Sequence, residues 1–188
     1  MTNPVPPASR LPEPAPLRWL FHDPRSAWLW LIARLYLAYI WLSSGLEKLT
    51  DPQGAWMGAQ AGSAVTKFLQ GALDKSQGDK PDVASWYASF VREVALPAAP
   101  ALSYLVTFGE LAVGLALLLG LFTGLAALLA GFMNLNYLLA GTISTNPLLL
   151  VLAVLVLVAW RVAGWWGVDG WAHRRRGVAG PRTVARRT

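Results

Sequence analysis

Hydrophobic positions in this chain fall into four long runs, separated by one long polar segment and two short turns. The first run covers about residues 26–48, and three more follow the polar segment 50–97, at about 100–120, 123–141 and 147–166. A helix that crosses a membrane needs about 20 mostly apolar residues. The pattern therefore predicts an all-α membrane protein, built as a bundle of four transmembrane helices.

The apolar stretch 102–140 is too long for one span and must fold back on itself. The sequence GLFTG, residues 120–124, supplies a turn, because glycine accepts the backbone conformations that tight turns need. Small residues recur about every fourth position from Ala112 to Gly131, a spacing that lets helices approach closely in lipid. We expect an antiparallel helical hairpin here, with GTIST, residues 141–145, as the next turn.

The polar segment 50–97 contains two amphipathic patterns. In DVASWYASFVREVALP, residues 82–97, the apolar positions from Trp86 to Val94 share one helical face. A weaker pattern of the same kind lies in SAVTKFLQGAL, residues 63–73. We predict two short helices that lie on the membrane surface or cap the bundle.

Composition supports a membrane protein and excludes several chemistries. The chain is 55% hydrophobic and 14% charged, whereas soluble domains carry about a quarter charged residues. Cysteine is absent, so thiolate catalysis and Fe–S ligation by this chain are excluded. Its two histidines, His22 and His173, lie outside the apolar runs. We therefore expect no metal site and no covalently bound cofactor.

The net charge of +6 is concentrated at the chain ends. Because cytoplasmic flanks of spans carry excess Lys and Arg, we place both termini in the cytoplasm of a prokaryote, with the membrane domain 26–171 in its plasma membrane. Residues 1–25 are rich in proline and predict a disordered cytoplasmic tail. Residues 172–188 form a basic cytoplasmic tail that we expect to contact the anionic lipid bilayer, and not nucleic acid.

Three polar residues lie deep in the apolar runs, where such groups are rare and mark candidate sites. At a rise of about 1.5 Å per residue, Arg34 and Glu110 both fall near the middle of a core about 30 Å thick. We predict that they pair, since an isolated buried charge is costly. Asn134 lies as far after the hairpin apex, Phe122, as Glu110 lies before it, and should donate to the carboxylate. We refer to these three residues as the predicted midplane layer.

Other polar residues lie nearer the outer surface. Thr107 and Tyr137 are equally far from the hairpin apex and should be level with each other. Glu47 and Lys48 end the first run, either as part of a site or as an exposed helix end. Asn136 points away from the predicted midplane layer, and the sequence indicates no partner for it.

Two residues in the last run have plainer interpretations. Asn146 before Pro147 has the chemistry of a helix N-cap, with proline in the first turn. Arg161 is expected to reach lipid headgroups from the inner end of the span. For the predicted midplane layer two interpretations stand: a structural tie between helices, or a functional site.

Five segments together resemble the DoxX family, over about residues 26–171. They are RLYLAYIWLSSGLEKL, SWYASFVREVALP, YLVTFGELAVGLALLLGLFTG, NLNYLLAGTISTNP and WRVAGWWGVDGW. The resemblance is nearest to DoxD, the membrane subunit of thiosulfate:quinone oxidoreductase. It implies a four-helix membrane bundle with an arginine in the first span, here Arg34, and a Gly-Glu pair in the second, here Gly109–Glu110. For some members it also implies sulfur-compound oxidation and quinone reduction alongside a partner subunit.

We therefore expect an integral membrane subunit of a redox system, linked to quinone and to thiosulfate oxidation. Lacking cysteine, it should act with a partner redox subunit. Glu110 and Arg34 would form a proton relay or a buried ion pair. The residues expected to bind the quinone are Asn134, Tyr137, Thr107, Glu47 and Lys48. The alternatives are a non-catalytic scaffold for a redox or stress-response complex and, less favoured because no repeat or broken span is evident, a small-solute transporter.

Overall fold

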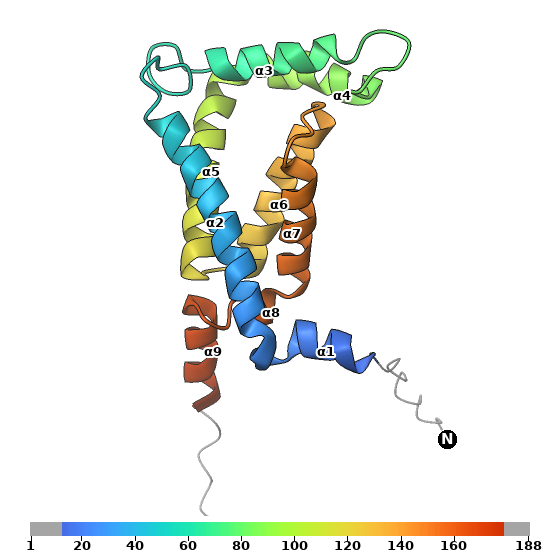
Figure 1. Ribbon diagram of the computed structural model, residues 1–188. Helices are drawn as coiled ribbons and strands as arrows, with labels where there is room; N and C mark the ends of the chain where they lie inside the picture. Colours follow the sequence, from blue (N-terminus) through green and yellow to red (C-terminus); the bar gives the residue numbers. More distant parts are fainter. Residues whose placement is uncertain (1–12, 179–188) are drawn as a thin grey trace, which may run out of the picture.

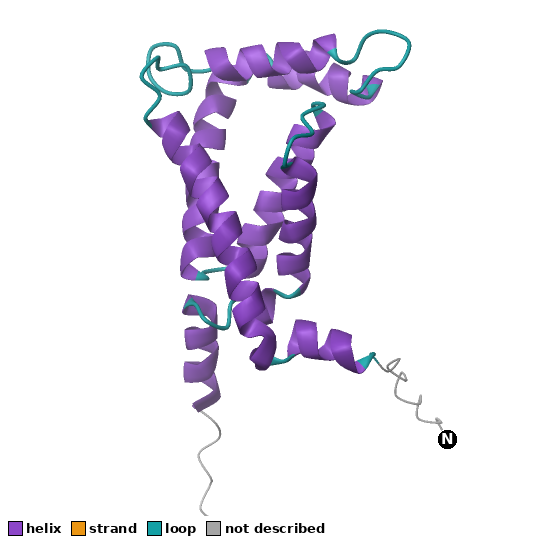
Figure 2. Cartoon of the chain, viewed as in Figure 1, coloured by secondary structure: helices purple, strands orange, loops and turns teal. Residues whose placement is uncertain are grey.

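The computed structural model describes residues 13–178, and within that range the chain forms helices and loops without a strand (Figure 2). The prediction of an all-α fold is confirmed. In chain order the elements are α1 (Ala15–His22), the 3₁₀ turn η1 (Pro24–Ser26), α2 (Ala27–Leu49), α3 (Ser63–Asp74), α4 (Ser85–Phe90), the π-helical turn η2 (Val91–Ala95), α5 (Ala99–Leu119), α6 (Thr123–Leu139), α7 (Asn146–Val158), α8 (Trp160–Ala163) and α9 (Val168–Val178).

The long helices form two pairs. Helix α2 packs along α5, and α6 packs along α7, with the most extensive contacts in the molecule. Figure 1 shows the pairs close together near α8 and farther apart toward α3 and α4, which lie across the top. We call the side with α3 and α4 the loop end, and the side with α1, α8 and α9 the terminal end.

Glycines set the close approach of α2 and α5. A Cβ atom on Gly45 would lie 2.8 Å from the Leu111 side chain, and one on Gly114 would lie 2.7 Å from the Leu42 backbone nitrogen. The two helix backbones are therefore nearly in contact. The small residues of α6 face a different neighbour, since a Cβ on Gly131 would meet α7 side chains at 3.7 Å. The hairpin helices α5 and α6 are thus less intimately packed than their spacing of small residues predicts.

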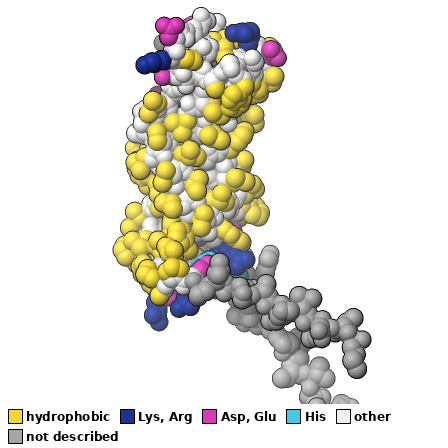
Figure 3. Space-filling model, turned by 90° about the vertical axis from the view of Figure 1, so that its right-hand side faces the viewer, with side chains coloured by type: hydrophobic (Ala, Val, Ile, Leu, Met, Phe, Trp, Pro, Cys, Tyr) yellow, Lys and Arg dark blue, Asp and Glu magenta, His cyan; other side chains and the backbone are white. Residues whose placement is uncertain are grey.

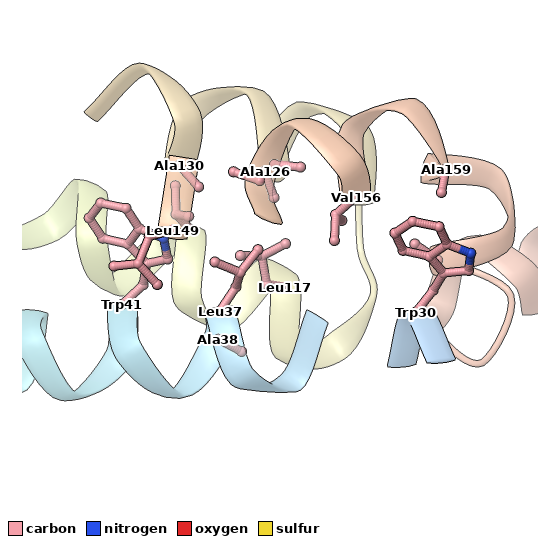
Figure 4. Close-up of a cluster of buried hydrophobic side chains, with 14 of the residues drawn as sticks. Trp30, Leu37, Ala38, Trp41, Leu117, Ala126, Ala130, Leu149, Val156 and Ala159 are labelled. Carbon is pink, nitrogen blue, oxygen red and sulfur yellow. The ribbon is translucent and has the colours of Figure 1, made fainter. Parts of the chain in front are cut away.

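Two apolar clusters hold the chain together. The larger lies between the helix pairs and includes Trp41 of α2, Leu117 of α5, Ala130 of α6 and Leu149 of α7 (Figure 4). The smaller joins α3, α4 and η2 to the start of α5 at the loop end. The α3–α4 layer is therefore packed onto the bundle through a core of its own.

The outer surface of the bundle is apolar. Large side chains such as Ile32, Tyr39, Leu105 and Phe132 are more than half exposed, and Figure 3 shows such groups over the middle of the molecule, with charged groups at its two ends. Soluble monomers rarely expose so much contiguous apolar surface. Two helical segments, Pro24–Leu49 and Ala99–Leu119, are long and apolar enough to cross a membrane, and α6 and α7 are shorter apolar helices.

Element positions follow the sequence prediction closely, with two corrections. Both short helices predicted in the segment 50–97 are present, as are the turns at 120–124 and 141–145. The last predicted run, however, breaks at Ala159, which separates α7 from α8.

The second correction concerns the tails. The prediction of a disordered tail is wrong for residues 15–22, which form α1. The predicted domain boundary at 171 falls within α9. Residues 1–12 and 179–188 of the predicted tails lie outside the described part of the chain.

Candidate functional site

Glu110 is the centre of a buried polar group that joins three helices. Its side chain, on α5, is 1% exposed. Oε1 accepts a hydrogen bond of 2.8 Å from the Tyr137 hydroxyl on α6. Oε2 lies 2.8 Å from Lys48 Nζ on α2, as an ion pair whose angles are not those of a hydrogen bond. We call Lys48, Glu110 and Tyr137 the Glu110 site.

Lys48 connects this site to the loop-end surface. Its Nζ donates to Ser44 Oγ at 2.7 Å and lies 4.8 Å from the centre of the Trp56 ring. Together with Glu47, which is exposed, Lys48 lines an open pocket of about 600 Å³ formed with the segment 51–67. Lys48 therefore lines an open pocket and at the same time pairs with a buried carboxylate.

Helix α3 covers the Glu110 site. The Phe68 ring packs edge-on against the Tyr137 ring, with centroids 5.9 Å apart. Thr107, one turn before Glu110, is fully buried, and its hydroxyl donates to the Ser103 carbonyl of its own helix at 2.8 Å. Its donor is therefore satisfied within α5, whereas Tyr137 uses its hydroxyl on the carboxylate.

Asn134 does not bond to Glu110, so that prediction is wrong. Asn134 is 0% exposed, and neither its Oδ1 nor its Nδ2 has a partner in residues 13–178. Trp41 of α2 is 3% exposed, and its Nε1 likewise lacks an acceptor within that range. A buried polar group left unpaired costs about 1–3 kcal/mol. Both side chains are therefore costly to bury as they stand in the interior of the bundle.

The direction in which side chains lean along a helix explains why Tyr137, and not Asn134, bonds to Glu110. Side chains lean toward the N-terminus of their own helix. In the antiparallel pair α5 and α6, Glu110 therefore leans toward the loop end, while Asn134 and Tyr137 lean toward the hairpin apex. The Tyr137 hydroxyl, one turn after Asn134, reaches back to the carboxylate. Asn134 leans toward the apex and makes no hydrogen bond to Glu110.

Arg34 does not pair with Glu110, which corrects the central prediction for the midplane layer. It is 1% exposed and donates from Nη2 to the Trp166 carbonyl at 3.2 Å. A Cβ on Gly167 would lie 2.8 Å from Arg34 Nη1, and one on Gly120 would overlap it. The guanidinium therefore lies at the terminal end, because its side chain leans toward the start of α2. Its Nε and Nη1 have no partner in the described residues.

Asp169 is a structural residue that sequence reasoning missed. Its carboxylate accepts from the backbone nitrogens of Phe122 at 2.9 Å and Thr123 at 2.7 Å. These nitrogens are at the start of α6, where unpaired N–H groups and the helix dipole favour a negative charge. The Asp169 nitrogen donates to the Gly120 carbonyl at 2.9 Å. The only signal in the sequence was an acidic residue between glycines, in WGVDG.

Asn136 has the partner that the sequence did not indicate. Its Nδ2 donates to the Phe132 carbonyl at 2.8 Å, and the Tyr87 hydroxyl donates to the Asn136 carbonyl oxygen at 3.1 Å. Tyr87 belongs to α4, so this contact fastens the loop-end layer to α6. Burial raises the pKa of the Tyr87 hydroxyl above its ordinary value, which keeps it protonated as a donor.

The N-cap prediction for Asn146 is wrong. Asn146 is the first residue of α7, and its Nδ2 donates back to the Thr142 carbonyl at 2.9 Å instead of accepting from the helix. Pro147 lies in the first turn, as predicted. Arg161 is exposed, and its guanidinium lies 5.2 Å from the Trp160 ring centre at the terminal end. Its contact with lipid headgroups remains a prediction.

The fold and the site together define a class: an all-helical membrane protein with a polar site among its apolar helices. The family model that matches is DoxX, over residues 29–142. The match covers more than half of the chain, and the protein belongs to the DoxX family. Neither the curated proteins nor the solved structures give a match.

The matched range runs from α2 to the turn after α6. It includes Arg34, Trp41 and the whole Glu110 site. Asp169 lies beyond it, in the part of the chain that completes the terminal end.

Proposed function

We propose that the protein is an integral membrane subunit of a quinone-linked redox system, acting with a partner subunit that oxidises a sulfur compound such as thiosulfate. The observation that carries the proposal is the buried Glu110 site, an ionisable group among apolar helices in a chain of the DoxX family. Such groups in membrane proteins mark substrate or proton pathways.

In this proposal α2, α5, α6 and α7 all cross the membrane. Helix α7 has only 13 residues, but residues 146–163, which include α8, would span about 27 Å at the helical rise. That length is close to the thickness of the hydrocarbon core, about 30 Å. The exposed apolar side chains around the bundle support the same arrangement.

Both termini would face the cytoplasm of a prokaryotic cell. Arg18 lies on α1, Arg25 lies in η1, and Arg174 and Arg175 lie on α9, so basic side chains collect at the terminal end. The loop end carries charges of both signs, as around its pocket. An excess of arginine on one side is the pattern of a cytoplasmic face.

Within this proposal the Glu110 site moves protons. Reduction of a quinone to a quinol takes two electrons and two protons. The partner would supply the electrons, for example by joining two thiosulfate ions through a new S–S bond. Glu110 would pass protons that enter at the loop-end pocket beside Lys48, and the Tyr137 hydroxyl would hold the carboxylate in place. The contacts of Lys48 with both pocket and carboxylate support this route.

The test is replacement of Glu110 by glutamine, which keeps the shape of the side chain and removes its charge. We expect thiosulfate-dependent quinone reduction in membranes to fall by about a hundredfold or more, a typical effect of losing a proton-transfer group. Glu93→Gln is the matched control, since Glu93 lies exposed on η2. Unchanged turnover in Glu110→Gln, with the protein present in normal amount, would contradict the proton role.

A scaffold function is the second candidate, and one observation favours it. Trp86, Phe90 and Val94 are 61%, 42% and 54% exposed and lie along one face of α4 and η2. Such a face fits contact with another membrane protein. Purification in mild detergent separates the two candidates. A stoichiometric partner that is lost in Trp86→Ser, together with no bound quinone and no turnover, would favour the scaffold.

A further inference from the structure

Trp41 and Asn134 are buried side chains without hydrogen-bond partners in the described residues, and the proposed proton route does not use them. Trp41 Nε1 can only donate, whereas the Asn134 amide can donate through Nδ2 and accept through Oδ1. All three atoms are inaccessible to solvent and unpaired within residues 13–178. Buried polar groups in folded proteins are normally paired with protein or water. These atoms therefore point to a polar ligand.

Trp41 and Asn134 come from opposite helix pairs, and both are buried in the interior of the bundle. Trp41 belongs to the large core cluster, and Figure 4 shows its ring beside Ala130 of α6 and Leu149 of α7. Asn134 follows Ala130 by one helical turn on the same buried face of α6.

Each of the two residues has a paired counterpart in the same helix. Trp30, also on α2 and 5% exposed, donates from Nε1 to the Leu20 carbonyl at 2.7 Å. Asn136, two residues after Asn134, is bonded to Phe132 and Tyr87. The fold therefore satisfies the hydrogen bonds of Trp30 on α2 and Asn136 on α6, and leaves Trp41 and Asn134 unsatisfied on the same two helices.

We infer that Trp41 and Asn134 are the ring-oxygen binding residues of the quinone site, donating through Nε1 and Nδ2 to the oxygens of the head group. The inference rests on the proposed function and deepens it by assigning the residues that recognise the ligand. Asn134 Oδ1 adds an acceptor for the hydroxyl of the reduced form. One side chain of each helix pair thus contacts the ring, so that the ligand bridges α2 and α6.

The test compares two ligands and four variants of the purified full-length chain. The ligands are 2-methyl-1,4-naphthoquinone and 2-methylnaphthalene, which has the fused rings without the oxygens. Trp41→Phe and Asn134→Leu remove the unpaired groups. Trp30→Phe and Asn136→Leu are the controls, and they remove paired groups of the same kind. Titration calorimetry gives affinity, and thermal unfolding of the ligand-free protein gives stability.

We expect Trp41→Phe and Asn134→Leu each to bind the naphthoquinone about tenfold more weakly, the effect of one lost hydrogen bond. Their affinity for 2-methylnaphthalene should not change. The two controls should keep wild-type affinity for the quinone. The ligand-free controls should unfold at lower temperature than the two site variants, because only the controls lose a hydrogen bond of the folded chain.

The possible failures are distinguishable. If the wild type does not bind the naphthoquinone, the proposed function fails. If the wild type binds and both site variants bind equally well, the quinone proposal stands and the assignment of Trp41 and Asn134 is overturned. Site variants that lose as much stability as the controls, with unchanged affinity, would show that ordered water pairs these groups, which also overturns the assignment. Asn134→Leu carries the test alone if Trp41→Phe does not fold.

Discussion

At the scale of single residues, the direction in which a side chain leans decides its partner. Three polar residues of the apolar runs were predictable as buried from sequence alone, and Arg34, Glu110 and Asn134 are all at most 1% exposed. Their partners were not predictable, because a depth estimated from Cα positions ignores how far each side chain leans along the helix axis. The sequence places Lys48 at the end of the first run, and its side chain leans back along α2 to reach Glu110.

The Lys48–Glu110 pair yields a prediction about stability. Lys48→Met removes the cation and leaves the buried Glu110 carboxylate with the Tyr137 hydroxyl but no counter-ion, and breaking a buried ion pair costs about 3–5 kcal/mol. The double variant Lys48→Met with Glu110→Gln should recover much of this loss, because no buried charge remains. Unfolding by denaturant in detergent micelles measures both values. Lys67→Met, at an exposed position of the same pocket, serves as control and should change little.

Equal losses for the single and the double variant would show that the carboxylate of Glu110 is not ionised in the folded protein. That result would mean that the Lys48–Glu110 contact does not stabilise the protein as an ion pair.

At the scale of elements, the helices were predictable and their contacts were not. Hydrophobic periodicity and length place α2, α3, α4, α5 and α6 within a few residues. The link between Tyr87 and Asn136 joins segments 49 residues apart, and no local pattern encodes such a contact. For the same reason the sequence indicated no partner for Asn136. The structure gives it contacts with Tyr87 and Phe132, and none with Glu110.

The Tyr87 contact predicts a pH effect on stability. Tyr87→Phe removes a hydrogen bond and should destabilise the protein by about 1 kcal/mol at neutral pH. Because burial raises the pKa of Tyr87 in the folded state, its contribution is fully present below the unfolded pKa of about 10 and is lost as pH rises toward the folded value. The gap between wild type and Tyr87→Phe should therefore close in strongly alkaline solution. Unfolding curves at neutral and alkaline pH measure it, and a constant gap would contradict the account.

At the scale of the whole molecule, the arrangement is two tightly packed helix pairs that approach each other at the terminal end (Figure 1). The sequence favoured α5 with α6 as the closest pair, because they form a hairpin. The tighter contact is instead α2 with α5, which are joined by the whole of the loop-end layer. Gly45 and Gly114 make this possible, and a glycine within a helix does not reveal in sequence which neighbour it faces.

Gly114→Ala tests this packing. The added Cβ would lie 2.7 Å from the Leu42 backbone nitrogen, so the helices must separate. We expect destabilisation of about 1–3 kcal/mol, the usual effect of overpacking. Gly131→Ala is the matched control, since its Cβ would meet α7 at an ordinary 3.7 Å. Unfolding in detergent ranks the two variants, and equal stability would show that the α2–α5 contact is not tight.

The position of Asp169 in the sequence affects the order in which contacts can form during synthesis. It caps a helix that begins 46 residues earlier, so the start of α6 stays uncapped during synthesis until α9 has left the ribosome. The hairpin of α5 and α6 is then incomplete at its turn while α7 and α8 are being made. Its turn is completed only after the segment with Asp169 has been translated, so the terminal end is assembled later than the hairpin itself.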